Sequence, residues 1–303
     1  MAYREDAKCP LWCEFLSRVT AGNAELVSFL QRITGYSLTG DTREQVLFLF
    51  YGTGANGKTT FLETLRYVLG DYAMGAEFNT FVASRGTSVR NDLARLAGAR
   101  FVTAVESQFN RPLAEEVVKQ ITGGDMITAR FLYSEHFEFR PQFKLFLATN
   151  HKPKIRGTDL AIRRRIHLIP FTVTIPCEEQ DKELPEKLRR EAPGIPCWAL
   201  EGLASWRRNG LTPPAAIAEA TKEYRSEQDV LQHFIEERCV LDPGAEVSAS
   251  GLYEAYSKWC QAVGESAVCK RDLSLALQER GIRRTRSSKC RGWIGIRPST
   301  ESQ

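Results

Sequence analysis

Residues 46–60 read VLFLFYGTGANGKTT, an apolar run that leads into a glycine-rich turn, and the helix-forming segment FLETLRYVLG follows. Gly52, four further residues and then Gly57, Lys58 and Thr59 have the spacing of a phosphate-binding loop (P-loop) between a buried strand and a helix. Glycines let backbone N–H groups turn toward a phosphate, and the N-terminus of the next helix adds a partial positive charge. The stretch therefore predicts an α/β domain of the P-loop NTPase class that binds a nucleotide.

Two side chains of this loop have expected chemical roles. Lys58 is expected to reach the β- and γ-phosphates, and the Thr59 hydroxyl is expected to ligate Mg²⁺, which makes ATP and Mg²⁺ the predicted cofactors. The alternative is a glycine-rich turn that only caps a helix, and the strand before the loop disfavours it. The residues predicted to line the nucleotide are Gly52, Thr53, Gly54, Ala55, Asn56, Gly57, Lys58, Thr59 and Thr60.

The composition is that of a folded protein with one large core or two domains. Of 303 residues, 43% are hydrophobic and 26% are charged, and the net charge of +4 is too small to identify a partner. No apolar run approaches the roughly 20 residues that span a bilayer, and the N-terminus lacks the apolar core of a signal peptide. Eight cysteines without a Cys-x-x-Cys pair predict reduced thiols and no structural zinc. We expect a cytoplasmic protein without a membrane partner.

Apolar strand-like runs alternate with helical ones through the middle of the chain. This alternation predicts a mainly parallel sheet with helices on both faces. A helical preface over residues 14–34 is expected to end at Gly35 as a C-cap, and a hairpin is expected from strands 126–133 and 137–140 around the turn 134–136. The expected sheet strands are 46–51, 100–105, 143–149 and 166–171, and the expected helices are 58–69 and 113–122.

After Phe171 the composition changes: an acidic segment with several prolines comes first, and a predicted helix with tryptophans follows at 198–208. A linker-like LTPPAA marks a boundary near residue 211. Three helices and a hairpin then predict a winged-helix domain, with the helices at 215–238, 251–264 and 270–280 and the hairpin at 282–298. The predicted division is a helical segment at 1–40, the ATPase domain at 41–210 and the winged helix at 211–303.

Hydrolysis needs an acid, a polar sensor and an arginine near the γ-phosphate. Glu106 and Asn150 each follow an apolar strand, so both are predicted to emerge at the sheet edge beside the loop. Solvated turn residues are the alternative for both. Three adjacent arginines, Arg163, Arg164 and Arg165, point in different directions, so at most two of them can serve one site, and a solvated basic turn is equally compatible with them.

Five segments together resemble one family. GTGANGKTT, FVTAVES, KQITGGDMITARFLYSEHFEF, FKLFLATNHKP and RRRIHLIPF, in this order, resemble the helicase module of phage and plasmid primase-helicases related to the poxvirus primase-helicase, in helicase superfamily three. The lead-in FLQRITGYSLTGD is similar as well. The resemblance covers roughly residues 14–171 well and the remainder loosely, as the winged-helix extension of many members.

The resemblance implies an AAA+-like ATPase that forms a ring, typically a hexamer, and translocates on DNA from 3′ to 5′. It implies that Glu106 activates water, that Asn150 senses the γ-phosphate and that one arginine of the triplet acts in the neighbouring subunit. It also implies that Lys119, Arg130 and His136 lie in a motif whose hairpin touches DNA in the channel. Only one acid ends the strand, since Val105 precedes Glu106, so the metal shell is predicted as Thr59 with Glu106 as its main carboxylate.

Members of the family usually carry a primase domain upstream, so we expect a fragment or a stand-alone helicase whose partner is a primase domain or protein. Residues 270–297 hold nine Lys and Arg against two acids, which predicts contact with DNA phosphates, with a solvated basic surface as the alternative. The residues expected to make that contact are Lys270, Arg271, Arg283, Arg284, Arg286, Lys289 and Arg291.

The predicted function is an ATP-dependent DNA helicase that replicates a phage, plasmid or integrated element in a bacterial cytosol. A loader or remodeller of DNA that does not unwind needs the same motifs. A nucleotide-switched DNA-binding regulator belongs to a different class and is also retained. A GTPase is disfavoured because the sequence has no Asn-Lys-x-Asp base-reading motif.

Overall fold

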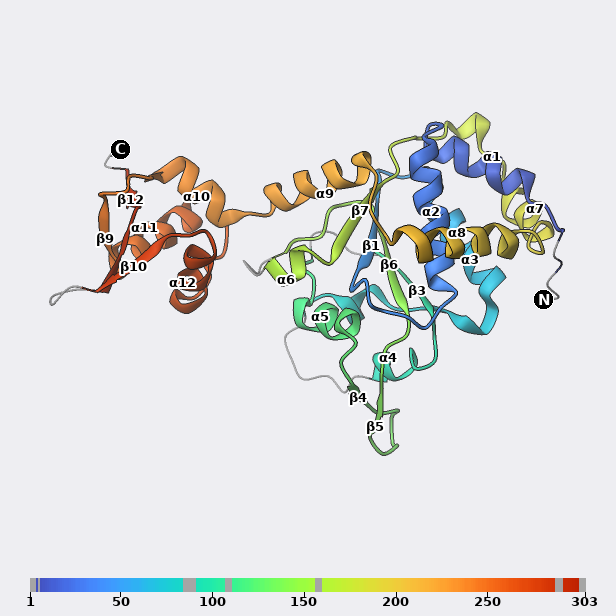
Figure 1. Ribbon diagram of the computed structural model, residues 1–303, viewed down its shortest axis with the longest axis horizontal. Coiled ribbons are helices and arrows are strands. Elements are labelled where there is room, and N and C mark those ends of the chain that lie inside the picture. Colours follow the sequence, from blue (N-terminus) through green and yellow to red (C-terminus); the bar gives the residue numbers. More distant parts are fainter. Residues whose placement is uncertain are drawn as a thin grey trace. The chain divides into compact units, whose positions relative to one another are not determined.

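The computed structural model describes residues 4, 6–83, 91–106, 111–155, 160–286 and 291–299 (Figure 1). The described residues form two compact units, one up to residue 155 and from 161 to 224, the other comprising residue 160 and the described residues between 225 and 299. The predicted boundary near 211 falls before α9 (Ala215–Glu227), whereas the units separate within that helix. Within the described ranges no helix is both long and apolar enough to cross a membrane.

The first unit is built on a five-stranded parallel sheet, as the alternation of strands and helices predicts. Its strand order is β2 (Ala73–Gly75), β3 (Phe101–Val105), β6 (Lys144–Thr149), β1 (Leu47–Tyr51) and β7 (Ile166–Pro170). Every neighbouring pair runs parallel, and β1 lies between β6 and β7. The one strand of this sheet that was not predicted is β2, a three-residue edge strand too short to give a periodic signal.

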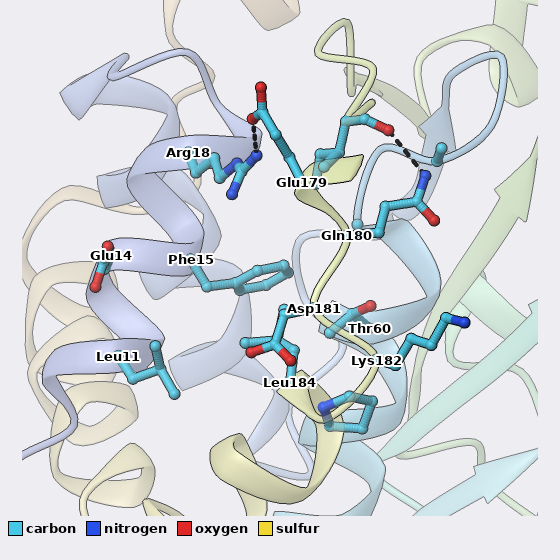
Figure 2. Close-up of a pocket in the computed structure, with 14 residues that line it drawn as sticks. Leu11, Glu14, Phe15, Arg18, Thr60, Glu179, Gln180, Asp181, Lys182 and Leu184 are labelled. Carbon is cyan, nitrogen blue, oxygen red and sulfur yellow. Dashed lines mark hydrogen bonds and ion pairs between the residues drawn. The ribbon is translucent and has the colours of Figure 1, made fainter. Parts of the chain in front are cut away.

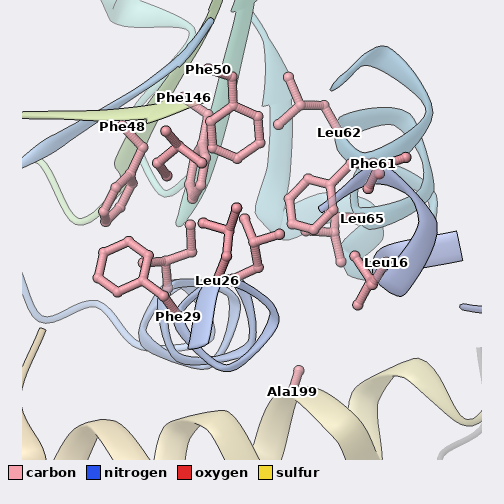
Figure 3. Close-up of a cluster of buried hydrophobic side chains, with 14 of the residues drawn as sticks. Leu16, Leu26, Phe29, Phe48, Phe50, Phe61, Leu62, Leu65, Phe146 and Ala199 are labelled. Carbon is pink, nitrogen blue, oxygen red and sulfur yellow. The ribbon is translucent and has the colours of Figure 1, made fainter. Parts of the chain in front are cut away.

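Helices cover both faces of the sheet. Because side chains alternate along a strand, Phe48 and Phe50 of β1 enter one core and Leu47 and Leu49 enter the other. Figure 3 shows Phe48, Phe50 and Phe146 facing Leu26 and Phe29 of α2. The first face carries α1 (Pro10–Val19), α2 (Ala24–Ser37), α3 (Lys58–Leu69), α7 (Leu184–Arg190) and α8 (Ile195–Asn209). The second carries η2 (Phe78–Phe81), α4 (Asn91–Ala94), α5 (Glu115–Gly123) and α6 (Leu160–Arg163).

The helical preface is two helices rather than one. Ala21 and Gly22 have left-handed backbones, with φ of 53° and 74°, and these end α1. Asn23 then caps α2, since its side chain accepts a hydrogen bond from the backbone N–H of Leu26. The apolar spacing continues across this break, so spacing alone does not reveal that the preface is two helices.

Gly35 is not the C-cap that the sequence suggested, because it lies inside α2, which continues to Ser37. A Cβ at Gly35 would lie 2.1 Å from the backbone nitrogen of Leu203 and 2.5 Å from the carbonyl oxygen of Ala199, both on α8. On the facing helix, a Cβ at Gly202 would lie 2.0 Å from the carbonyl oxygen of Gln31. The two glycines therefore let the backbones of α2 and α8 touch.

The hairpin between α5 and β6 is shorter than predicted. Its strands are β4 (Ile127–Ala129) and β5 (Phe137–Phe139), which pair antiparallel, and residues 130–136 connect them. The predicted tip at 134–136 was wrong, because the turn is closed by a hydrogen bond from the backbone N–H of Ser134 to the carbonyl of Phe131. Tyr133, with φ of 61°, is fully exposed at this turn.

The predicted helix over 215–238, which crosses from the first unit into the second, is broken. The break falls after Glu227, and the Asp229 side chain caps α10 (Val230–Arg238) by accepting from the backbone N–H of Gln232. The helices α11 (Ala249–Ala262) and α12 (Lys270–Glu279) follow. The strands β9 (Glu246–Ser248), β10 (Arg283–Arg286) and β11 (Arg291–Ile294) form an antiparallel sheet, and β8 (Cys239–Val240) pairs with β12 (Arg297–Pro298). Trp293 is buried in this unit's core.

The close packing of α2 and α8 makes a stability prediction. Replacement of Gly35 by Ala places a methyl group against backbone that cannot turn away, so we expect a loss of about 1–3 kcal/mol in the free energy of unfolding. Denaturant unfolding measures this loss. Ser28→Ala, on the exposed side of the same helix, is the control and should change stability little. Equal stabilities of the two variants would contradict the close approach.

Candidate functional site

The loop between β1 and α3, residues 52–57, is shaped by two glycines. At Gly52 a Cβ would lie 2.2 Å from Nδ2 of Asn56 and 2.3 Å from the carbonyl oxygen of Phe171. Gly57 has φ of 82° and precedes Lys58, the first residue of α3. A side chain at Gly52 would push the loop away from β7, and one at Gly57 would strain the backbone where the helix begins.

Asn56 fixes the loop from inside. Its side chain is buried, and its amide Nδ2 donates to the carbonyl of Phe171 over 3.4 Å. Its Oδ1 accepts from the Lys58 ammonium over 3.0 Å. Asn56 was predicted only to line a nucleotide, and its bridge between the loop and the end of β7 is a further role that the sequence did not predict.

The Lys58 ammonium is held by three oxygens. It donates to the carbonyl of Gly52 over 2.6 Å, to Oδ1 of Asn56, and to Oδ1 of Asn150 over 3.2 Å. Burial lowers the pKa of Lys58 to about 8, because a charged amine loses solvation there. The Lys58 ammonium is therefore fixed in position by neutral oxygens, which do not balance its positive charge. An anion that replaced one of these acceptors would stabilise that charge.

Glu106 and Asn150 meet because they follow adjacent strands, β3 and β6. One carboxylate oxygen of Glu106, Oε2, accepts from the backbone N–H groups of Asn150 over 3.3 Å and His151 over 3.4 Å. The other, Oε1, is buried and has no hydrogen-bond partner among the described residues. Such an oxygen is available to a water molecule or a cation.

Lys58, Glu106 and Asn150 line one cavity. Its volume is ≈ 330 Å³, which lies in the range of about 300–1,000 Å³ that small-molecule sites occupy. Of the predicted nucleotide-lining set, all but Gly52 and Thr53 line it. Its wall consists of Gly54, Ala55, Asn56, Gly57, Lys58, Thr59, Thr60, Val105, Glu106, Ala148 and Asn150.

The donors present suit a hard cation that keeps several water ligands. Thr59 and Glu106, the predicted ligands of Mg²⁺, both line the cavity, and the buried Oε1 of Glu106 is an oxygen donor without a partner there. Among the described residues no group of three or more His, Cys, Asp and Glu side chains is placed to hold a metal ion by itself. Phosphate oxygens and water would have to complete such a shell.

The three arginines differ in their surroundings, and none of them lines the cavity at the loop. Arg163 and Arg165 are buried. The Arg165 guanidinium donates to the hydroxyl of Thr122 over 3.1 Å and to the carbonyl of Ala161 over 2.6 Å, so it joins α5 to α6. Arg164 is exposed. The sequence could not make this distinction, because burial of the residues around a turn depends on the rest of the fold.

The residues predicted to contact DNA lie in both units. Lys119 is on α5, and Arg130 and the exposed His136 are in the connection of the hairpin. Lys270 and Arg271 are exposed at the start of α12, and Arg283, Arg284 and Arg291 are exposed on β10 and β11. Two of them contact rings, because Lys270 lies over Tyr253 and Arg284 over Trp293. Lys289 lies outside the described residues, as does the side chain of Arg286.

A second cavity, of ≈ 410 Å³, lies on the other side of the loop (Figure 2). It is enclosed by α1, by Ala55, Gly57 and Thr60, and by the acidic segment 175–185. The backbone N–H of Ile175 donates to the carbonyl of Ala55 over 2.8 Å, so this segment is bonded to the loop. Neither α1 nor residues 175–185 had a predicted function, and only the acidic, proline-containing composition of PCEEQDKELPEK could have drawn attention to this side of the loop.

Comparison with known proteins agrees with this architecture. A family model described as a family of unknown function (DUF5906) matches residues 50–165. A protein of Acanthamoeba polyphaga mimivirus, named as a candidate helicase, is 32% identical over 243 residues, which are 73% of this chain and 25% of that protein. A protein of African swine fever virus, named as a candidate primase, is 26% identical over 260 residues, 78% of this chain and 27% of that protein.

The homologues of this chain are viral helicase and primase-helicase proteins. The resemblance drawn from the five sequence segments is thereby confirmed. The chain spans about a quarter of the length of these primase-helicase relatives. Among solved structures, the apo structure of the NrS-1 C-terminal region shares the fold, with a TM-score of 0.59 and 12% identity over 98% of this chain and 77% of that one.

The buried ammonium of Lys58 predicts a pH-dependent affinity for anions. With a pKa of about 8 in the unliganded protein, the amine is charged at pH 7 and mostly neutral at pH 9. Affinity for inorganic tripolyphosphate should therefore fall above pH 8, by up to about tenfold per pH unit. Isothermal titration calorimetry across this range measures it.

The control is Lys58→Arg, whose guanidinium stays charged throughout. The affinity of this variant for tripolyphosphate at each pH shows how much of the pH dependence comes from ionisation of the tripolyphosphate itself. Identical profiles for the two proteins would show that Lys58 does not titrate in this range.

Proposed function

We propose that this chain is the motor part of an ATP-dependent DNA helicase. The observation that carries the proposal is the convergence of Lys58, Glu106 and Asn150 on one cavity beside the loop, with one oxygen of Glu106 left without a partner. A loop that only capped a helix would need neither a buried lysine nor a carboxylate and an amide delivered by two other strands. The candidate-helicase names of the relatives support the same proposal.

In this proposal the loop binds the phosphates of ATP and each side chain has one task. The Lys58 ammonium exchanges the Asn150 oxygen for a phosphate oxygen, which frees Asn150 to hydrogen-bond the γ-phosphate or the attacking water. Oε1 of Glu106 accepts the proton of that water. Mg²⁺ would be held directly by the Thr59 hydroxyl and through a bound water by Glu106, and it would neutralise phosphate charge.

The arginine finger of the proposed ring is Arg164. The guanidinium of Arg165 is already committed to Thr122 and Ala161, and Arg163 is buried, whereas Arg164 is exposed and can reach a neighbouring subunit. None of the three lines the described wall of the cavity in its own chain, so an arginine of this triplet that acts at the γ-phosphate would act in another copy. This need for a second copy supports a ring, for which we propose the hexamer of superfamily three.

DNA would be contacted by the hairpin and by the second unit. The exposed ring of Tyr133 at the hairpin turn suits stacking against an unpaired base, and Arg130 and His136 suit the backbone. The basic surface on α12, β10 and β11 suits duplex phosphates, as in a winged-helix domain. We propose 3′-to-5′ movement from the family resemblance.

The deciding experiment is strand release from a forked duplex with one labelled strand, with and without ATP, beside ATP hydrolysis with and without single-stranded DNA. Glu106→Gln is the inactive control, because an amide cannot accept the proton of water, and it should lower hydrolysis about 100-fold or more while ATP still binds. Release that needs ATP and Glu106 supports the helicase.

Hydrolysis stimulated by DNA without strand release from either polarity of fork would instead favour a loader or remodeller. Binding to a defined duplex site without stimulated hydrolysis would favour a nucleotide-switched regulator. Either result would overturn the unwinding activity.

The assignment of Arg164 predicts complementation between two inactive variants. Arg164→Ala should bind ATP normally but hydrolyse it about 1,000-fold more slowly, and Lys58→Ala should fail to bind phosphate. Mixed rings contain sites in which Lys58 comes from one variant and Arg164 from the other, so the mixture should regain part of the activity. ATP hydrolysis of the mixture measures this gain.

Arg207→Ala, at an exposed arginine of α8, is the matched control and should hydrolyse ATP at the unmodified rate. An active Arg164→Ala, or a mixture no more active than its parts, would remove Arg164 from the site.

A further inference from the structure

The cavity between α1, the loop and residues 175–185 has the features of a small-molecule subsite. Its apolar wall is formed by Leu11, Phe15, Ile175 and Leu184, and Figure 2 shows the ring of Phe15 facing the space between α1 and the acidic segment. Polar side chains stand at its rim. At ≈ 410 Å³ it falls within the size range of ligand pockets, which combine apolar walls with a few placed polar groups.

This cavity shares part of its wall with the site at the loop. Ala55, Gly57 and Thr60 line both the ≈ 330 Å³ cavity and this one. A molecule whose phosphates lie against the N-terminus of α3 would therefore extend past Thr60 into the second cavity. The loop separates a polar half, suited to phosphates and a cation, from a more apolar half.

We infer that the cavity bounded by α1, the loop and residues 175–185 receives the purine base and ribose of the nucleotide. The inference rests on the proposed function and deepens it, because it names the elements that select the base. Phe15 and Leu184 supply the apolar surface on which a flat base packs. Base binding then depends on the helical preface and on the acidic segment, two parts of the chain that lie far apart in the sequence.

Gln180 is the candidate for reading the base. Its Nε2 donates to the carbonyl of Ile175 over 2.9 Å, which orients the amide, and its Oε1 accepts no hydrogen bond from the described residues. A fixed oxygen acceptor suits the exocyclic amine of adenine and does not suit the carbonyl at the same place on guanine. The site should therefore prefer ATP to GTP.

Two contacts hold the walls of this base cavity together. Arg18 of α1 forms an ion pair with Glu179 at the rim (Figure 2). The backbone N–H of Ile175 donates to the carbonyl of Ala55, which fastens the start of the acidic segment to the loop. A ligand that fills the cavity would contact both walls and the loop at once.

The test compares two ligands that share phosphates but differ in the base. Binding of ATP and of inorganic tripolyphosphate is measured by calorimetry on the full chain, with Leu184→Trp as the variant that fills the cavity. ATP affinity should fall at least about tenfold, and tripolyphosphate affinity should stay unchanged, because the loop is not altered. Leu200→Trp, at an exposed leucine of α8, is the matched control.

A second variant keeps the test valid if the tryptophan disturbs folding. Gln180→Ala removes only an exposed amide, and it should reduce the preference for ATP over GTP in the same assay. Unchanged ATP affinity in Leu184→Trp together with an unchanged ATP preference in Gln180→Ala would overturn the inference.

The outcomes separate this inference from the proposed function. Loss of ATP binding in Leu184→Trp with retained tripolyphosphate binding supports the base cavity even if the unmodified protein releases no strand from a fork. Equal affinity of the unmodified protein for ATP and tripolyphosphate would show that the base adds nothing and would overturn the inference while leaving the phosphate site intact.

Discussion

The absence of a side chain at Gly52 is the constraint on which the site depends. Because Gly52 has no side chain, the Asn56 amide can lie against it and donate a hydrogen bond to the carbonyl of Phe171. A Cβ at Gly52 would occupy the space of that amide and that carbonyl. The bond fixes the loop to the end of β7, and Asn56 in turn holds the Lys58 ammonium. The position of the lysine is thus set by packing at a residue six positions earlier.

Two buried lysines show how this fold accommodates charge. The Lys58 ammonium faces two side-chain oxygens and one carbonyl, so its partners can be exchanged. The Lys144 ammonium instead donates to the backbone carbonyls of Thr39, Asp41 and Gln142, which are fixed by the chain. These bonds connect the segment after α2 to the start of β6. Burial lowers the pKa of Lys144 to about 7. The same residue type therefore has a structural role at one end of the sheet and lies in the candidate site at the other.

Much of the fold could be predicted because its signals are local. The four longer strands of the sheet, the helices after β1 and β3 and the hairpin strands follow from apolar periodicity and turn residues. The errors fall where a local pattern has two explanations. Gly35 has the composition of a C-cap, but its lack of a side chain serves contact with α8, and the apolar spacing of residues 14–34 continues through a break at Ala21 and Gly22.

The sequence by itself determined that a glycine-rich loop follows an apolar strand and precedes a helix, and that Glu106 and Asn150 each follow an apolar strand; the spacing of Gly52, Gly57, Lys58 and Thr59 then predicted the class of site. Only the tertiary structure decided which side chains meet. The adjacency of β3 and β6 brings Glu106 to Asn150, and burial distinguishes Arg164 from its two neighbours. It also brings α1 and residues 175–185 together against the loop. The physical reason is that strand order and burial depend on contacts between residues far apart in the chain, which local spacing does not encode.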